Sequence, residues 1–110
     1  MDLVIDELII EDDRPEHIRK HGVTIDEVVE VVTGSYVFFK GKFDRWVLIG
    51  LTEQGNFLTV VVGERPQPKT YGLVTARPAH ITERRLYKRV TEQEQESEGG
   101  VARNDKDNAA

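Results

Sequence analysis

The sequence predicts one α+β domain, built on an antiparallel sheet with flanking helices, over residues 1–91. Three observations lead to this fold class. The length of 110 residues suits a single domain with a modest core. Two helical segments with capping signals come early in the chain, and a run of strand-like segments follows them. A last amphipathic helix closes the order strand, two helices, four strands, helix, which is typical of α+β domains.

The N-terminal segment predicts a strand followed by a short helix. Residues 3–10 form an apolar run that only Asp6 and Glu7 interrupt. Acidic residues then precede Pro15, and proline is favoured in the first turn of a helix. Gly22 is a stop signal, so we expect this helix over about residues 14–21.

The second helix is predicted by a capping box and by its periodicity. Thr24 and Glu27 have the spacing at which each side chain bonds the other residue's amide. Gly34 is expected to end the helix in a positive-φ conformation. The apolar residues fall at i, i+3, i+4 and i+7, on one helical face: Ile25, Val28, Val29 and Val32.

Four strands are expected over residues 36–40, 45–52, 57–63 and 70–75. A four-residue loop containing Gly55 joins the second and third as a hairpin. Apolar residues lie on both faces of the second strand, which indicates the middle of a sheet covered on each side. We therefore expect Trp46 to be a core residue.

The closing helix is expected to begin at Thr82 as its cap and to run to about Val90. Its inward arc is Glu83, Leu86, Tyr87 and Val90, and its outward cations are Arg84 and Lys88, with Arg85 and Arg89 on the flanks. Residues 92–110 are strongly polar and predict a disordered acidic tail. This tail either solubilises the protein or lies over the basic face as an internal competitor.

Charge is segregated along the chain, whose net charge is −5. Residues 1–13 carry six acids and no base, whereas residues 14–90 carry 13 lysines and arginines against 8 acids. The densest cluster is residues 75–89, which hold five cations and one acid. Such a basic surface in an acidic protein predicts an anionic partner, most commonly phosphate.

Several classes of site are excluded or disfavoured. Without cysteine there is no disulfide, thiolate nucleophile or Cys-ligated metal, and neither a signal peptide nor a membrane span is evident. We expect a cytoplasmic protein with no cofactor and no membrane partner. His17 and His21 have the i, i+4 spacing of a two-histidine metal pair, but position 18 is isoleucine where a zinc-protease motif has glutamate. We therefore predict no metal. We expect His17 to be a surface residue and His80 to make local hydrogen bonds with the backbone where the last helix begins.

Cleavage of RNA without a metal needs a base, an acid and cations that neutralise the charge on the phosphorane. Histidine transfers protons near neutral pH, and arginine offers bidentate contacts to phosphate. The residues of these types that we select are Lys20, His21, Arg45, Arg77, Arg84 and Arg85. The alternative role of Arg77 is a structural salt bridge to Glu83 or Asp44.

Three segments together resemble the BrnT family of bacterial toxins: KHGVTIDEVVEVV, RWVLIGLTEQGNFLTVVV and VTARPAHITERRLYKR. The resemblance covers about residues 14–90. It implies a RelE-like microbial-ribonuclease fold with a small twisted sheet. It also implies an mRNA-cleaving toxin of a type II toxin–antitoxin system and a cognate antitoxin, usually of the ribbon-helix-helix type.

Carried over residue by residue, the resemblance implies two groups. The catalytic group is Lys20, His21, Arg77, Arg84 and Arg85, with Lys20 or His21 transferring protons. The RNA-binding group is Arg45, Lys69, Tyr87 and Lys88, in which Tyr87 is alternatively a core residue. The competing hypotheses are a non-catalytic RNA-binding or protein-interaction module that kept the fold, and a small regulatory domain.

Overall fold

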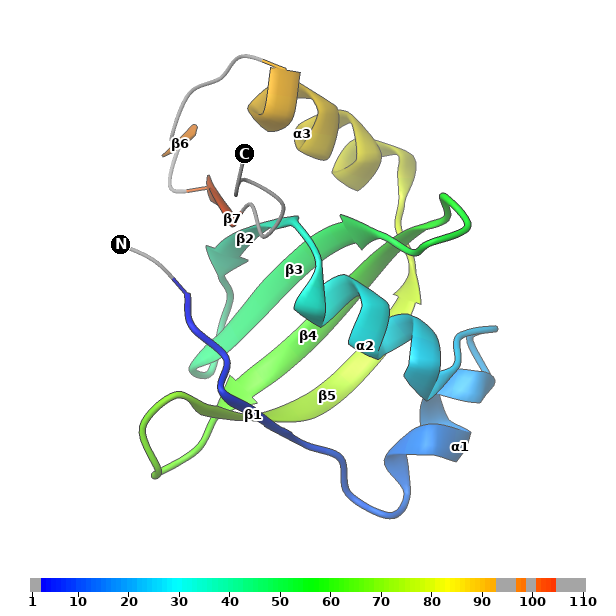
Figure 1. Ribbon diagram of the computed structural model, residues 1–110, viewed down its shortest axis with the longest axis vertical. Coiled ribbons are helices and arrows are strands. Elements are labelled where there is room, and N and C mark those ends of the chain that lie inside the picture. Colours follow the sequence, from blue (N-terminus) through cyan, green and yellow to red (C-terminus); the bar gives the residue numbers. More distant parts are fainter. Residues whose placement is uncertain (1–2, 93–96, 99–100, 105–110) are drawn as a thin grey trace.

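The structure is a computed structural model that describes residues 3–92, 97–98 and 101–104 of the chain. Figure 1 shows a twisted sheet with three helices around it. The helices are α1 (Arg14–Arg19), α2 (Ile25–Thr33) and α3 (Ile81–Glu92). The strands are β1 (Glu7–Ile9), β2 (Tyr36–Lys40), β3 (Arg45–Leu51), β4 (Phe57–Glu64), β5 (Thr70–Pro78), β6 (Ser97–Glu98) and β7 (Val101–Asn104).

The sheet has the strand order β1-β5-β4-β3-β2-β7-β6. Strands β2 to β5 form an antiparallel meander, as expected from the short loops between them. The first strand departs from the prediction of an antiparallel sheet, because β1 pairs with β5 in parallel. The chain runs from β1 through α1 and α2 before the meander starts, and this long connection permits a parallel pairing. The fold class is confirmed as α+β, with a mixed sheet.

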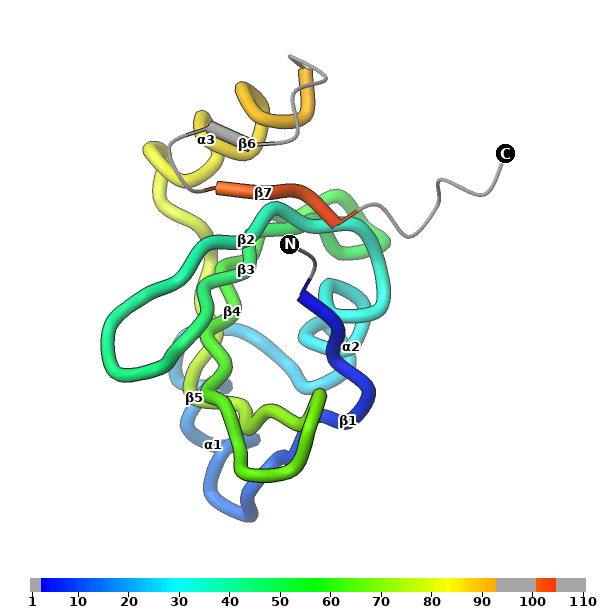
Figure 2. Tube along the Cα trace, turned by 90° about the vertical axis from the view of Figure 1, so that its left-hand side faces the viewer, coloured from blue at the N-terminus to red at the C-terminus, as the bar shows by residue number. Residues whose placement is uncertain are grey.

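Two apolar cores lie on opposite faces of the sheet, as predicted from strands that are apolar on both faces. On β3, Trp46 and Leu48 belong to the larger core, which α2 covers. Ile49 belongs to the smaller core, which α3 covers through Val90 and Leu86. Figure 2 shows α2 beside the β2–β5 strands, with α3 and β7 above. The sheet is therefore buried on both sides of its centre, and Trp46 is a core residue that is 8% exposed.

The caps of α2 confirm one prediction and correct another. The amide of Glu27 donates to Thr24 Oγ1 at 3.2 Å, and the amide of Thr24 donates to Glu27 Oε1 at 2.9 Å, so the capping box is complete. Gly34 follows the helix, but its φ is −97°, so the expected positive φ is wrong. A Cβ at Gly34 would lie 2.9 Å from the carbonyl oxygen of Glu30, and this close approach is what requires glycine there.

The start of α3 also differs from the prediction. Thr82 is not the cap, because the helix already begins at Ile81. The amide of His80 donates to Glu83 Oε1 at 2.8 Å, so Glu83 has the role that the third residue of a capping box plays. The inward arc is as predicted: Val90 is buried, and Glu83, Leu86 and Tyr87 are half-buried.

The predicted disorder of the tail is wrong for residues 101–104, which form β7 against the edge of β2. Val101 is the physical reason, because it is 8% exposed and packs with Val37, Ile49 and Val90. β6 pairs with β7, and the remaining residues of the predicted tail lie outside the described ones. Within the described residues no helix is long and apolar enough to span a membrane.

Candidate functional site

A polar cluster lies on the side of the sheet that α3 covers. It consists of Arg77, Glu83, Thr59 and the backbone amide of His80, and we call it the Arg77 hub. Arg77 Nη1 and Nη2 donate to the two carboxylate oxygens of Glu83, each at 2.8 Å. Thr59 Oγ1 and the amide of His80 donate to Glu83 Oε1, also at 2.8 Å. Of the two partners considered for Arg77, the structure selects Glu83.

Sheet register explains why these groups meet. Thr59 of β4 is paired with Arg77 of β5, so both side chains project from the same face. Glu83 lies on the inward arc of α3 and reaches down to them. The side chains of Arg77 and Glu83 are 30% and 17% exposed. The hub therefore fastens the start of α3 to β4 and β5.

Charge pairing dominates the titration of the hub. Burial alone would raise the pKa of the Glu83 carboxyl, but the hydrogen bonds from Arg77, the His80 amide and Thr59 together lower it to about 2. The hydrogen bond to Glu83 raises the pKa of Arg77. Both groups are thus charged throughout the neutral range.

A separate set of polar contacts joins β5 to α1. Thr75 lies two residues before Arg77 on the same strand face, roughly 7 Å away by strand geometry. Its Oγ1 is 3.1 Å from His17 Nε2. The His17 ring in turn makes an edge contact with that of His21, with 5.5 Å between the ring centroids. His17 of α1 therefore lies beside the strand face from which Arg77 projects, and His21, just beyond the helix, lies against His17.

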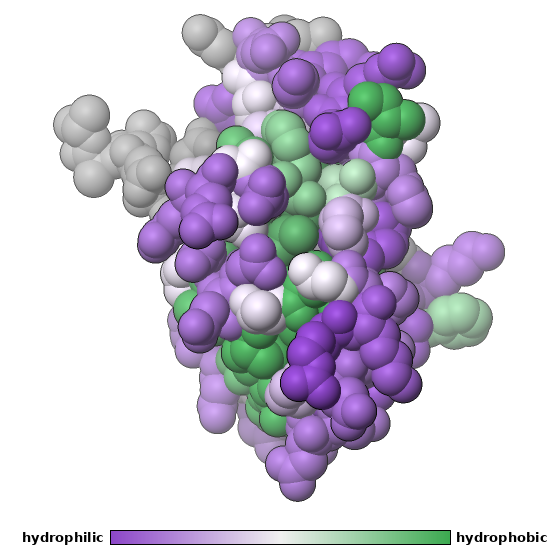
Figure 3. Space-filling model, turned by 90° about the vertical axis from the view of Figure 1, so that its right-hand side faces the viewer, coloured by the Kyte–Doolittle hydropathy of each residue, from purple (hydrophilic) through white to green (hydrophobic). Residues whose placement is uncertain are grey.

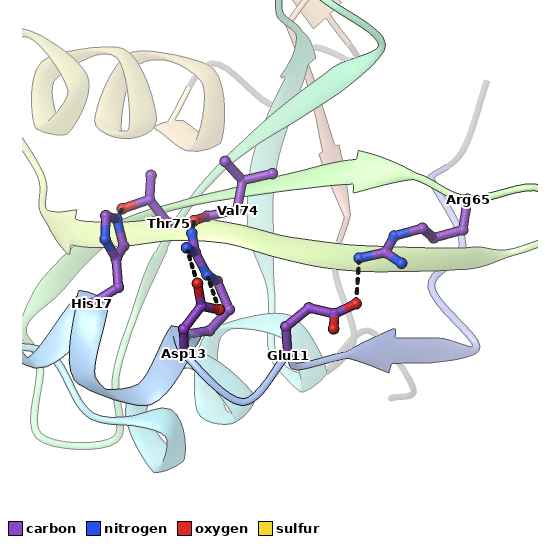
Figure 4. A network of polar contacts seen from close by, with 7 residues as sticks. Glu11, Asp13, His17, Arg65, Val74 and Thr75 are labelled. Atoms are coloured by element: carbon purple, nitrogen blue, oxygen red, sulfur yellow. Dashed lines mark hydrogen bonds and ion pairs between the residues drawn. The ribbon is translucent and has the colours of Figure 1, made fainter.

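Arg14 holds α1 in this position. Its Nη1 donates to the carbonyl oxygen of Val74 at 2.6 Å, and Asp13 accepts from its Nε and Nη2 (Figure 4). Ile18, on the same helix, is completely buried in the larger core. A shallow hollow of about 280 Å³ opens here, lined by Asp13, Arg14, Glu16, His17 and Lys20.

A second arginine, Arg65, lies over the first part of β5, near Gly72. Arg65 Nη2 donates to Glu11 Oε2 at 3.3 Å (Figure 4). Its guanidinium lies over Gly72, where an added Cβ would be 2.2 Å from Nη2. Glycine at this position makes room for the arginine. Three arginines on or over β5, namely Arg14, Arg65 and Arg77, are thus each ion-paired with a carboxylate.

The outer face of α3 carries unpaired cations. The side chains of Arg84, Arg85 and Lys88 are exposed, and none forms an ion pair with the described residues. Tyr87 points the other way and packs edge-on against Phe57, with ring centroids 5.3 Å apart. Tyr87 is therefore half core and half surface.

The remaining predicted residues lie at the margins of the sheet. Lys20 and His21 are exposed just beyond α1. Arg45 is exposed at the start of β3, paired in register with Gly63. Lys69 has a φ of 59° in the turn before β5, eight residues from Arg77, which corresponds to roughly 26 Å along a strand. The structure thus places His21 against His17, near the face of β5 that carries Arg77, and it does not bring Lys69 to the hub.

Three polar residues of this region were missed or misplaced by sequence reasoning. His17, predicted as a surface residue, is half-buried against Thr75. The roles of Thr59 and Thr75 depend on cross-strand register, for which the sequence carries no local signal. The i, i+4 spacing of His17 and His21 was visible and did indicate a shared helix face. Within the described part of the chain, no three His, Cys, Asp or Glu side chains are grouped closely enough to hold a metal ion.

An open groove of about 510 Å³ lies between the end of α2, the β3–β4 loop and Tyr87 of α3. Val29 and Leu51 in its lining are 43% and 36% exposed. Glu30 and Glu53 lie at its margin, where Glu30 Oε1 accepts from the amide of Glu53. Figure 3 shows the side of the molecule that carries the β3–β4 hairpin, on which apolar surface forms a stripe between polar margins.

Comparison with known proteins identifies the fold class: the chain has a BrnT-like fold. One solved structure with this likeness is the 1.1 Å crystal structure of the Brucella abortus ribonuclease toxin BrnT. It aligns with a TM-score of 0.54 and 21% sequence identity, over 67% of this chain and 96% of that one. No family model matches the chain, and no curated protein matches it. About a third of the chain therefore lies outside the part shared with BrnT.

Proposed function

We propose that this protein is a toxin-like endoribonuclease, acting on mRNA without a metal ion and neutralised by a cognate antitoxin of the ribbon-helix-helix type. The observation that carries the proposal is the contact of His17 with both His21 and Thr75, which lies two residues before Arg77 on the same face of β5, within a BrnT-like fold. It brings proton-transfer groups and a guanidinium to one strand face. These are the residue types that cleavage at a phosphate requires.

In this proposal the cations have two roles: some attract the RNA backbone, and others contact the scissile phosphate. Arg84, Arg85 and Lys88 are exposed on α3 and attract the RNA backbone, because exposed cations neutralise phosphates. Arg77 is held by both oxygens of Glu83, which fixes its guanidinium beside the path of the substrate. The 30% of its side chain that remains exposed is available to the scissile phosphate. Lys20, which lines the hollow beside His17, faces the same phosphate from α1.

The antitoxin part of the proposal draws on the exposed apolar surface. A partner that covers the cations of α3 would also meet the neighbouring groove, where Val29 and Leu51 are exposed beside Tyr87. Burying such apolar surface is the main favourable term in protein association. One partner bound there would exclude RNA from α3.

The test is cleavage of a labelled single-stranded RNA by the purified protein in excess EDTA, together with growth of bacteria in which the chain is induced. We expect cleavage, growth arrest and falling mRNA levels. Arg84→Ala/Arg85→Ala should reduce all three, whereas Lys42→Ala, which removes an exposed cation from the β2–β3 loop, should reduce none. If the wild type neither cleaves RNA nor slows growth, the proposal is wrong.

A second function, a non-catalytic RNA-binding or protein-interaction module, is favoured by one specific observation. Among the described residues, Arg14, Arg65 and Arg77 on or over β5 are each ion-paired, so this face presents little unneutralised charge to a phosphate. This alternative predicts that the wild type binds RNA at low salt and leaves it intact. The cleavage assay therefore separates the two functions directly.

A further inference from the structure

His17 and His21 stand out because their two imidazoles lie side by side, next to the strand face that carries Arg77. Their ring centroids are 5.5 Å apart at an interplanar angle of 76°. His17 is half-buried and bonded to Thr75, whereas His21 is exposed. Two imidazoles in different environments at one place are suited to different proton-transfer roles.

Local structure fixes the arrangement of both rings. The i, i+4 spacing puts the two residues on one side of α1 and the turn that follows it. Arg14 fastens the start of the helix to Val74, and the fully buried Ile18 anchors its middle. The contact with Thr75 Oγ1 occupies His17 Nε2 and orients the ring; in the tautomer in which Nε2 donates to Thr75, Nδ1 is free to take a proton.

We propose that His17 and His21 are the general base and the general acid of RNA cleavage in this protein. The inference rests on the proposed ribonuclease function and assigns the proton transfers within it. His17 is the new member of the pair. Lys20, the alternative to His21 for proton transfer, keeps only a charge-neutralising role.

The reaction that this pair performs is transesterification within the RNA strand. His17 takes the proton of the 2′-hydroxyl, and the 2′-oxygen forms a bond to phosphorus. The bond from phosphorus to the 5′-oxygen breaks, and that oxygen receives the proton of His21. The products are a 2′,3′-cyclic phosphate and a free 5′-hydroxyl, so no further reactant is needed.

The charges that face the pair are mixed. Asp13, Arg14, Glu16 and Lys20 surround His17 on α1, and these residues line the same hollow. From β5 the charged group is Arg77, two residues beyond Thr75, and Glu83 neutralises it. Because Asp13 is bound by Arg14, the unpaired cation nearest the pair among these is Lys20, which favours an anionic phosphate there.

The experiment measures kcat against pH on a DNA oligonucleotide containing a single ribonucleotide, with mass detection of the cyclic phosphate. We expect His17→Ala and His21→Ala each to lower kcat about a hundredfold or more, the range for loss of a general acid or base. The His17 variant should lose the acidic limb of a bell-shaped profile, and the His21 variant the alkaline limb. His80→Ala is the matched control, because that side chain is exposed and only the backbone amide contacts Glu83.

Two further variants separate proton transfer from structure. His17→Gln can still bond Thr75 but cannot act as a base, so it should be folded and as slow as His17→Ala. Added imidazole should partly restore His17→Ala and leave Thr75→Val unchanged. Wild-type activity in His17→Gln, or an unchanged pH profile, would overturn the pair while the ribonuclease function stands. A wild type that does not cleave would overturn both.

Discussion

The arginines that contact β5 and the cations on the outer face of α3 carry the same charge in opposite environments. Arg14, Arg65 and Arg77 each bind a carboxylate. Arg84, Arg85 and Lys88 are exposed and form no ion pair with the described residues. The first group joins elements of the fold, and the second is available to a partner. A basic stretch in a sequence can therefore contain both kinds of cation.

The difference follows from position on the secondary structure. Arg77 lies on a strand face that α3 covers, so its charge must be compensated by a neighbour. Glu83 supplies this compensation because it is on the inward arc of the same helix. Arg84, the next residue, is turned about 100° around the helix axis and reaches solvent. Neighbouring residues in the chain thus have separate roles.

The largest effect is expected from breaking the Arg77 hub. Glu83→Ala leaves Arg77, Thr59 and the His80 amide without their acceptor, and should lower the free energy of unfolding by about 2–3 kcal/mol. The loss stays below the roughly 3–5 kcal/mol of a fully buried pair because Arg77 is partly exposed. Urea unfolding measures it. Arg84→Ala should change stability by less than about 0.5 kcal/mol.

A double-mutant cycle isolates the pair itself. Arg77→Ala/Glu83→Ala should lower the free energy of unfolding by clearly less than the sum of the two single substitutions. The reason is that each single substitution leaves the other charge uncompensated. If Glu83→Ala lowers the free energy of unfolding no more than Arg84→Ala does, the contrast between the two groups of cations does not hold.

A smaller loss of stability is expected when low pH protonates Glu83 and weakens its bonds to Arg77. The pKa of Glu83 is about 2 in the folded protein against an ordinary value of 4.5, so its stabilising effect is fully present above about pH 4.5. Stability should fall as the pH decreases from 4.5 towards 2, because protonation then weakens the bonds to Arg77. Thermal unfolding of the wild type and of Glu83→Gln over this range measures the effect.

The comparison with Glu83→Gln is needed because other carboxyl groups titrate in the same direction. The hydrogen bond from Arg14 lowers the pKa of Asp13, and the bonds from Trp46 and Lys40 lower that of Glu64. These contributions remain in the variant. The acid-induced loss should therefore be smaller in Glu83→Gln, and equal losses in the two proteins would contradict the assignment of the low pKa to Glu83.

The contrast also explains which features could be predicted from the sequence. The capping box of Thr24 and Glu27 and the inward arc of α3 depend on residues three or four apart, and both were predicted correctly. The bond between His17 and Thr75 and the position of Thr59 beside Arg77 depend on how distant segments align. The strand at residues 101–104 depends on one apolar side chain, Val101, fitting a place that β2 and α3 create. A polar composition alone gives no sign of such a place.

The BrnT-like fold was predicted from the order of three sequence segments, and the structural likeness confirms it. The order of such segments is therefore informative about the fold. It did not convey which cations are paired, because pairing is decided by single carboxylates such as Glu11 and Asp13 near the acidic N-terminus. The acidic start of the chain, which charge counting sets apart from the basic middle, thus supplies partners to it.

The smallest change in the free energy of unfolding is expected for substitutions on the outer face of α3. Their main effect should be on nucleic-acid binding. Arg84→Ala/Arg85→Ala/Lys88→Ala should leave the free energy of unfolding within about 1.5 kcal/mol of the wild type, since each is an exposed substitution of about 0.5 kcal/mol or less. It should weaken binding of a non-cleavable, all-deoxy strand about tenfold at low salt. The slope of log affinity against log salt should fall by up to about 2, or about 0.7 for each phosphate of a single strand that the protein no longer neutralises.

Arg65→Ala is the matched control on the β5 side, because it removes a cation that Glu11 already neutralises. It should leave the salt slope almost unchanged. If instead it flattens the slope as much as removal of an α3 cation does, then ion pairing on β5 does not prevent phosphate binding, and the nucleic acid follows β5 as well as α3. Equal slopes for all variants and the wild type would mean that neither group of cations binds the strand.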